Sequence, residues 1–436
     1  MITTQGTSIA QDLGTNKGRN DLKPESEASY INTNQYDKIY EFCMNVGEGL
    51  AEKQERIGMV EQGPIRPPSE SKSLLLRLTR NCPWNKCLFC PVYKDTTFSR
   101  RPLAEIKKDI DQLGEIIEHI QRVSHKLGCA GRITGTVISH VYPNKNYNPM
   151  YRHVAHWLYF GEGSVFLQDA NSLIMKPEDL AEILNYLRKR VPGIRRITSY
   201  ARSQTLARRE VNQLVMLREA GLNRIHIGLE SGYDPVLRFM RKGSTTLDRI
   251  KAGCLVREAG ISLSEYVMPG LGGKRWWREH ALATADVLNR INPDFIRLRS
   301  LRVPQTAPLS EKIDSGEMEL LDDDGVVREI RLFIENLHGI TSTVTSDHIM
   351  NLLEEISGTL PDDKERMLSV ADRYLDLEEE ERVIYKVGRW GGAYRSLDDL
   401  SDLELRSKIE QVIRQWNLET SGQVDTMIKE MADQYI

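Results

Sequence analysis

The stretch that decides the fold reads SLLLRLTRNCPWNKCLFCP and spans residues 73–91. Its first part, residues 73–79, is mostly apolar and short, which predicts a buried strand of a parallel sheet. The rest is a loop in which Cys82, Cys87 and Cys90 lie within nine residues. We therefore expect a strand that delivers three thiols to one edge of a sheet.

Strand and helix patterns alternate downstream of this loop. Apolar runs bounded by turn residues predict five more strands, at residues 164–169, 195–200, 224–230, 261–268 and 295–301. Helical spacing lies between them, at residues 102–127, 177–190, 205–220, 246–259 and 277–290. Strands joined by crossover helices form a parallel sheet whose ligands bind at the carboxyl ends of the strands. Six units fit a doubly wound sheet or an incomplete barrel.

The rest of the chain divides around these units. Residues 1–70 are predicted to be an N-terminal extension, polar and disordered over residues 1–30, with one amphipathic helix over residues 36–58. Residues 71–305 hold the six strands. Residues 306–436 are rich in charge and helical spacing, so we expect a helical C-terminal region with no further strand.

Composition narrows the class of protein. The chain has 436 residues, is 40% hydrophobic and carries a formal net charge of −3. This charge gives no electrostatic reason to expect a nucleic-acid or membrane partner and disfavours RNA as substrate, although it leaves room for a local basic patch. No apolar run is long enough to span a membrane, and residues 1–25 lack a signal-peptide pattern, which predicts a cytoplasmic protein.

The three clustered cysteines predict an iron–sulfur site. Three thiolates on one loop each bind one iron of a [4Fe–4S] cluster, and the fourth iron stays open to another ligand, because the remaining Cys43, Cys129 and Cys254 are distant in the sequence. The alternative is a zinc site. Structural zinc usually takes four ligands in two pairs, and this loop holds a single CxxC pair.

At this point the sequence resembles the radical SAM superfamily. The common signature of that family is CxxxCxxC after the first strand, whereas this chain has the CX4CX2C spacing of an iron–sulfur oxidoreductase branch. Over residues 73–365 the resemblance continues in the segments FLQDANSL, ITSYARS, IHIGLESGYD and EYVMPGLGG. It implies a partial (β/α)6 TIM-like barrel that holds a [4Fe–4S] cluster and S-adenosylmethionine (SAM). It also implies an electron donor such as flavodoxin or ferredoxin.

The resemblance assigns residues to both cofactors. The cluster ligands would be Cys82, Cys87 and Cys90. Phe89 would pack against adenine, as would the backbone near Gly270 and Gly272, because glycine permits close approach to a flat ligand. The other SAM contacts would come from strand ends: Asp169 and Asn171 for the methionyl amine, Ser199, Tyr200 and Arg202 for the ribose or the carboxylate, and Glu230 for the ribose or the substrate.

Several alternatives stay open. A salt bridge between Glu230 and Arg202 explains those two charges equally well. Residues 128–163, a long connection without clear structure, are predicted to cover the barrel mouth and touch the substrate. Two functions are possible. The first is an enzyme that cleaves SAM and abstracts hydrogen with the 5′-deoxyadenosyl radical. The second is a non-catalytic iron–sulfur protein for electron transfer or redox sensing. Nothing in the sequence selects a substrate.

Overall fold

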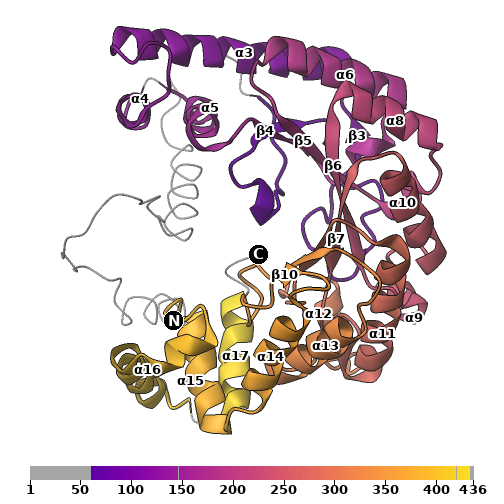
Figure 1. The fold of residues 1–436 in the computed structure, drawn as a ribbon, viewed down its shortest axis with the longest axis vertical. Coiled ribbons are helices and arrows are strands. Elements are labelled where there is room, and N and C mark those ends of the chain that lie inside the picture. Colours follow the sequence, from indigo (N-terminus) through magenta and orange to yellow (C-terminus); the bar gives the residue numbers. More distant parts are fainter. Residues whose placement is uncertain (1–59, 146, 419, 433–436) are drawn as a thin grey trace.

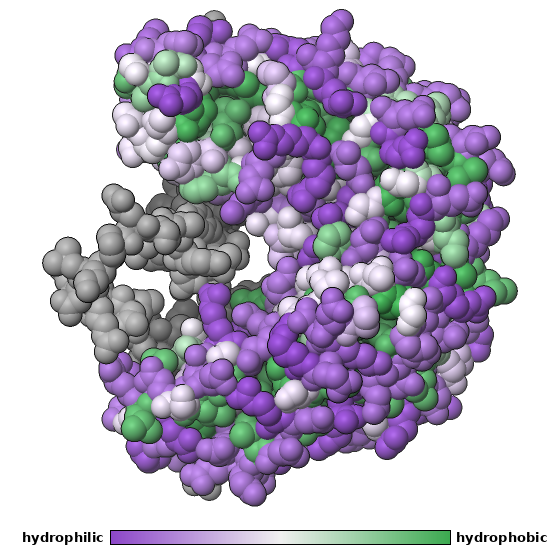
Figure 2. Space-filling view, viewed as in Figure 1, coloured by the Kyte–Doolittle hydropathy of each residue, from purple (hydrophilic) through white to green (hydrophobic). Residues whose placement is uncertain are grey.

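The computed structural model describes residues 60–145, 147–418 and 420–432. The predicted disorder over residues 1–30, the predicted helix over residues 36–58 and Cys43 lie outside these residues. Within the described part, no helix is both long and apolar enough to cross a membrane. Figure 2 shows a mostly hydrophilic face on which hydrophobic residues form small separate groups.

One large sheet organises the molecule. Its strand order is β1-β4-β5-β6-β7-β8-β9-β10, and all neighbours are parallel except β9 and β10. The strands follow the chain without a reversal of order, as in a barrel and unlike a doubly wound sheet. The strands of this sheet are β1 (Leu74–Arg77), β4 (Ser164–Gln168), β5 (Arg196–Ala201), β6 (Leu222–Glu230), β7 (Ser262–Val267), β8 (Phe295–Leu298), β9 (Thr343–Thr345) and β10 (Gly358–Thr359).

Helices surround this sheet on its outer side. Figure 1 shows α3, α6 and α8 along the top of the molecule and α13 to α17 at the bottom, with the sheet between them. The helices are α3 (Leu103–Lys126), α4 (Gly135–Val141), α5 (Pro149–Phe160), α6 (Pro177–Arg190), α7 (Ser203–Leu206), α8 (Val211–Ala220), α9 (Asp234–Phe239), α10 (Thr246–Glu258), α11 (Gly273–Ile291), α12 (Leu309–Asp314), α13 (Asp323–Glu335), α14 (Lys364–Leu375), α15 (Glu379–Trp390), α16 (Leu403–Trp416) and α17 (Ser421–Ala432). Short 3-10 turns are η2 (Pro68–Glu70), η3 (Ser172–Ile174) and η4 (Leu397–Ser401).

The partial (β/α)6 TIM-like barrel predicted from the sequence is confirmed, and so are its six strands. The expectation of no strand after residue 305 is wrong, because β9 adds a seventh parallel strand beside β8 and β10 turns back along it. The boundary between barrel and C-terminal region therefore stays a prediction. The remainder of residues 306–432 is mainly helical, as expected.

Two predictions of local structure needed correction. The pattern over residues 205–220 is two helices, α7 and α8, because a capping box formed by Glu210 and Gln213 starts a new helix. Residues 128–163 contain α4 and α5 instead of an irregular loop. The prediction that they cover the barrel mouth is not supported for α5, which lies along the edge of β1: Nε2 of His153 accepts a hydrogen bond from Leu75 N at 3.3 Å.

The interior of the barrel is filled by side chains. Alternate residues of parallel strands point to opposite sheet faces, and the inward set includes a chain of aromatic rings. Ring centroids lie 5.1 Å apart for Phe166 and Tyr200, 5.8 Å for Tyr200 and His226, and 5.6 Å for His226 and Tyr266. Below them Glu70 of η2 is fully buried, 3.5 Å from His226. A ligand therefore reaches this barrel from the carboxyl ends of the strands.

Candidate cluster and cofactor site

The three cysteines lie on a loop that is closed like a hairpin. Two short strands, β2 (Thr79–Arg80) and β3 (Ser99–Arg100), pair in antiparallel register at its base. Residues 81–98 between them therefore leave the carboxyl end of β1 and return before α3 begins. This placement puts the thiols at the edge of the barrel where ligands bind.

A buried carboxylate fastens this loop to the sheet. Asp169 follows β4 and is fully buried. Its Oδ2 accepts hydrogen bonds from Arg77 Nη2 at 2.6 Å and from the Asn81 backbone N–H at 3.1 Å. Its Oδ1 accepts one from the Tyr93 hydroxyl at 2.6 Å. Burial, together with the Asp169 carboxylate, raises the pKa of Tyr93, so this hydroxyl stays a donor.

Further bonds hold the loop from its other side. Within the loop itself, Nζ of Lys94 donates to the carbonyl oxygens of Asn85 and Cys87, at 3.1 and 2.9 Å. The Leu88 N–H donates to the carbonyl of Met240 at 3.1 Å, and the Leu88 carbonyl accepts from Leu309 N at 2.9 Å. The loop is thus tied to both the β1 side and the β6 side of the barrel.

The donor set fits an iron–sulfur cluster. Burial raises the pKa of the Cys87 thiol to about 11, while nearby Lys242 lowers it; burial also raises the pKa of Cys90. Iron would have to displace these protons, as metal binding to thiols does. Among the described residues no three His, Cys, Asp or Glu side chains are placed to hold a single metal ion. A cubane does not need such convergence, because it offers a separate iron to each thiolate.

Two cations lie beside the cysteines, and both are partly or largely buried. The Arg202 guanidinium lies 5.0 Å from the ring centroid of Trp84 and donates from Nη2 to the Lys242 carbonyl at 3.0 Å. Burial lowers the pKa of Arg202, and the nearby Cys82 and Cys87 raise it. Nζ of Lys242 lies 5.7 Å from the Phe89 ring centroid. These cations face the region where the cluster thiolates would bring negative charge.

Glu230 completes this charged group. It ends β6 in a left-handed conformation with φ of 56°, which is uncommon for a residue other than glycine. Its Oε2 lies 2.5 Å from Nζ of Lys242 and 4.0 Å from Arg249. The alternative of a salt bridge between Glu230 and Arg202 is not found, and the ion-pair partners of Glu230 are Lys242 and Arg249. Local backbone strain of this kind is typical of functional sites.

The structure separates the predicted SAM contacts into two groups. Phe89, Arg202 and Glu230 meet around the cysteine loop, as the preceding contacts show. Asp169 and Asn171 instead form internal links. Asn171 accepts a hydrogen bond from Arg202 N at 3.1 Å and donates to Thr205 Oγ1 at 2.8 Å, so it holds the end of β5. The expectation that Asp169 offers a free carboxylate does not match its three protein partners.

The remaining predicted contacts have partners within the chain. Ser199 shares a strand face with Ile197, which packs in the core under the helices, and its hydroxyl donates to the Tyr200 carbonyl. Tyr200 is part of the aromatic filling of the barrel. A Cβ on Gly272 would meet the Trp276 backbone at 2.9 Å, and the Gly270 N–H donates to Glu329 at 3.2 Å. Close packing against Trp276 accounts for Gly272, and the positive φ of 87° accounts for Gly270.

Sequence reasoning missed four residues of this site. Lys242 lies in an aperiodic turn after α9, and nothing in the sequence relates that turn to the cysteine loop. Arg77 stands in the apolar run that predicts the first strand, and a lone charge in such a run signals a polar strand end. Tyr93 and Trp84 stand next to the cysteines, but their partners come from distant segments.

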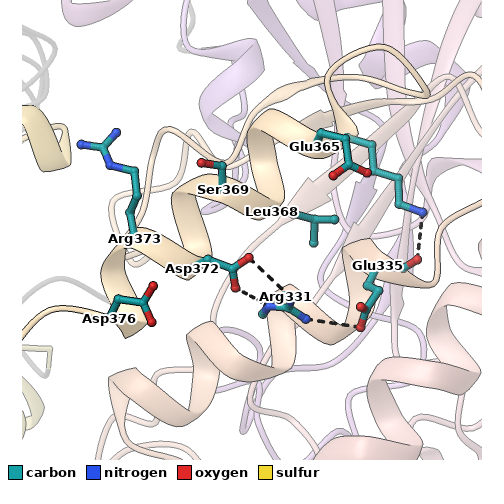
Figure 3. Close-up of a pocket in the computed structure, with 9 residues that line it drawn as sticks. Arg331, Glu335, Glu365, Leu368, Ser369, Asp372, Arg373 and Asp376 are labelled. Atoms are coloured by element: carbon teal, nitrogen blue, oxygen red, sulfur yellow. Dashed lines mark hydrogen bonds and ion pairs between the residues drawn. The ribbon is translucent and has the colours of Figure 1, made fainter.

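A hollow on the surface between α13 and α14 is a weaker candidate. Figure 3 shows Arg331 between Asp372 and Glu335 in this hollow, with dashed lines to both. Arg331 pairs with Asp372 and, at 3.3 Å, with Glu335, while Lys364 donates to the Glu335 carbonyl at 2.8 Å. Charges that are satisfied in this way leave little to recognise a ligand, and none of the three cysteines lines the hollow.

Comparison with known proteins gives a family match over part of the chain. The sequence model of the radical SAM superfamily matches residues 76–285. The chain is 22% identical over 281 residues to the tRNA uridine(34) acetyltransferase of Methanocaldococcus jannaschii, covering 61% of this chain and 49% of the relative. The enzyme of that name from Methanocaldococcus infernus is 21% identical over 299 residues, with 64% and 52% covered. The chain thus spans about half the length of these curated relatives.

Solved structures give more distant likenesses. Elp3 of Methanocaldococcus infernus aligns with a TM-score of 0.34 and 18% identity over 42% of this chain and 48% of that one. Coproporphyrinogen III oxidase (HemN) of Escherichia coli, described as a radical SAM enzyme, aligns with a TM-score of 0.39 and 17% identity over 61% and 52%. The family match covers the three cysteines and strands β4 to β7, so residues 76–285 are similar to the radical SAM superfamily, whose cofactors are a [4Fe–4S] cluster and SAM.

Proposed function

We propose that this protein is an enzyme that cleaves SAM reductively and uses the resulting radical to abstract hydrogen from a substrate. Cys82, Cys87 and Cys90 would hold the [4Fe–4S] cluster. When bound, the cluster supplies one electron to the sulfonium of SAM, and cleavage of a C–S bond yields methionine and the 5′-deoxyadenosyl radical. An electron donor such as flavodoxin or ferredoxin would restore the reduced cluster.

One observation carries this proposal: a charged group surrounds the cysteine loop at the barrel mouth. Arg202 and Lys242 would bind the methionyl carboxylate, and the bidentate fork of Arg202 suits that group. Glu230 would accept hydrogen bonds from ribose hydroxyls, since its Oε2 accepts no hydrogen bond from described residues beyond the Lys242 ion pair. Phe89 offers its ring to adenine.

The alternative function is that of a non-catalytic iron–sulfur protein. An electron carrier needs the thiols and the buried loop, but it has no use for a carboxylate and two cations beside that loop. Reduced, reconstituted protein distinguishes the two functions by EPR. We expect added SAM to shift the signal of the reduced cluster, because SAM would ligate the open iron. An unchanged signal would favour the electron carrier.

The substrate class belongs to this proposal as well. The two curated relatives are named as enzymes that act on a tRNA uridine, and they match this chain over about half their length. Their names make RNA one candidate substrate, against the expectation from net charge. The distribution of charge around the mouth bears on this question.

A further inference from the structure

Exposed cations gather on one side of the barrel mouth. They come from the cysteine loop, from α9 with the turn that follows it, and from the start of α11. We call this set the rim patch, and it consists of Lys86, Arg238, Arg241, Arg275 and Arg278. Among the residues that the structure describes, none lies within ion-pair distance of these five side chains. Two carboxylates are exposed on α11: Glu279, and Asp286, which lies 3.9 Å from Arg290. Glu319, in a later segment, is paired with Lys274.

Aromatic rings alternate with these cations. The Arg275 guanidinium lies 4.5 Å from the ring centroid of Trp276, and that of Arg278 lies 4.3 Å from Trp277. Lys86 Nζ lies 5.1 Å from the centroid of Trp84. All three tryptophans are partly exposed. Arginines stacked on partly exposed indoles present flat π surfaces and positive charge together.

The rim patch adjoins the cysteine loop. Phe239 of α9 meets Trp276 edge to face, with centroids 5.7 Å apart. Both rings pack on one apolar cluster that includes Leu88, which lies between two of the cysteines, and Met240. Trp84 also donates from Nε1 to the Arg241 carbonyl at 2.6 Å. A partner bound on the patch would therefore lie next to the site of the radical.

The filled barrel interior limits which substrates fit. Phe166, Tyr200, His226 and Tyr266 occupy the space beneath the mouth, so a substrate has to present its reacting group from outside. A large substrate that docks on the rim and inserts one group meets this requirement. A small molecule held deep within the barrel does not.

We propose that the rim patch binds RNA in single-stranded form. Its arginines would pair with phosphates, and its indoles and stacked guanidiniums would receive unstacked bases, which is how proteins hold RNA loops. An acidic protein would use the cations but would leave the three partly exposed tryptophans unexplained. This inference rests on the proposed function and names its substrate class. The net charge of −3 counts the whole chain, whereas binding depends on this local excess.

Fluorescence anisotropy with the full, cluster-loaded chain tests the proposal. The probe is a fluorescein-labelled RNA hairpin with an unpaired loop, and the comparison is the same length of RNA duplex. We expect Arg275→Glu/Arg278→Glu to raise the Kd about tenfold or more. The slope of log Kd against the logarithm of the salt concentration should fall by about two. We expect Trp277→Ala to weaken hairpin binding about 5- to 100-fold, the usual effect of losing one stacked base, with little effect on the duplex.

The matched control reverses two exposed charges elsewhere. Arg188→Glu/Lys189→Glu changes the end of α6, which leads into the amino end of β5 and so lies at the opposite edge of the sheet.

The proposal is overturned if this control weakens hairpin binding as much as the rim variant does, if duplex binds as well as hairpin, or if a polyglutamate peptide competes as well as unlabelled hairpin. SAM cleavage without RNA is measured separately. If the wild-type chain cleaves SAM but does not bind the hairpin, this inference alone is refuted. If the wild-type chain binds the hairpin but does not cleave SAM, only the proposed function is refuted.

Discussion

The hydroxyl of Tyr93 donates a 2.6 Å hydrogen bond to Oδ1 of Asp169, and this contact joins the far end of the cysteine loop to the end of β4. Arg77 and Asn81 bind the other carboxylate oxygen from the start of the loop. One buried carboxylate therefore fixes both ends of the segment that carries the three thiols. We interpret Asp169 as a positioning residue for the cluster loop.

Asp169→Asn should therefore loosen the loop. It leaves Arg77 without its fully buried partner, so we expect the free energy of unfolding to fall by about 3 kcal/mol. Tyr93→Phe removes one hydrogen bond and should cost about 1 kcal/mol. Urea unfolding measures both changes, and iron content after reconstitution should fall in the same order. The control is Asp362→Asn, at an exposed aspartate.

A different outcome would restore the role that the family resemblance gives Asp169. If Asp169→Asn keeps wild-type stability and iron content but loses SAM binding, the carboxylate is a cofactor ligand and not a loop anchor.

Lys242→Gln tests the cation beside Phe89 and Glu230. We expect the Kd for SAM to rise about 10- to 100-fold, because a charged hydrogen bond to the methionyl carboxylate would be lost. Iron content should stay unchanged, since Lys242 is not a cluster ligand. Equilibrium dialysis against labelled SAM measures the change, and Lys251→Gln, at an exposed lysine of α10, is the control. Unaltered SAM affinity would remove Lys242 from the site.

The stability of the protein should fall in acid because of His153, which packs at the edge of β1. Burial lowers the pKa of this imidazole to about 3, and the neutral ring accepts the Leu75 N–H. The unfolded state binds a proton near pH 6.5 and the folded state only near pH 3, so stability falls as the pH drops through this interval. At pH 5 we expect a loss of about 2 kcal/mol relative to pH 8.

His153→Gln keeps an acceptor but does not titrate, so its stability should vary less between pH 8 and pH 5. Chemical denaturation at several pH values measures the difference. His140→Gln, at an exposed histidine, should follow the wild type. If His153→Gln shows the same acid sensitivity as the wild type, the imidazole is not the group responsible.

The sequence predicted the parts of this molecule that depend on local periodicity. Residues 177–190 were predicted as a helix and are one, since Pro177, the acidic first turn and the basic last turn all favour it. The missed strand β9 has three residues, too few for a pattern, and it is specified by pairing with β8. The face of Ser199 could have been predicted, because it follows from alternation with Ile197.

The site was less predictable than the barrel. The three cysteines and the strand ends were visible in the sequence, because a parallel sheet brings strand ends to one edge. Side-chain partners were not visible. Asp169 reads as a free strand-end carboxylate until Tyr93 and Arg77 are seen to reach it, and Lys242 reaches Glu230 only because the turn after α9 folds back over β6.

The central claim is that Cys82, Cys87 and Cys90 hold a cluster that cleaves SAM. The most direct measurement is the yield of 5′-deoxyadenosine by mass spectrometry after anaerobic reconstitution with iron and sulfide and addition of dithionite and SAM. We expect the wild type and Cys254→Ala, at an exposed cysteine of α10, to form 5′-deoxyadenosine, and Cys87→Ala to form none. A loaded cluster with no 5′-deoxyadenosine, or a Cys87→Ala variant as active as the wild type, would contradict the account.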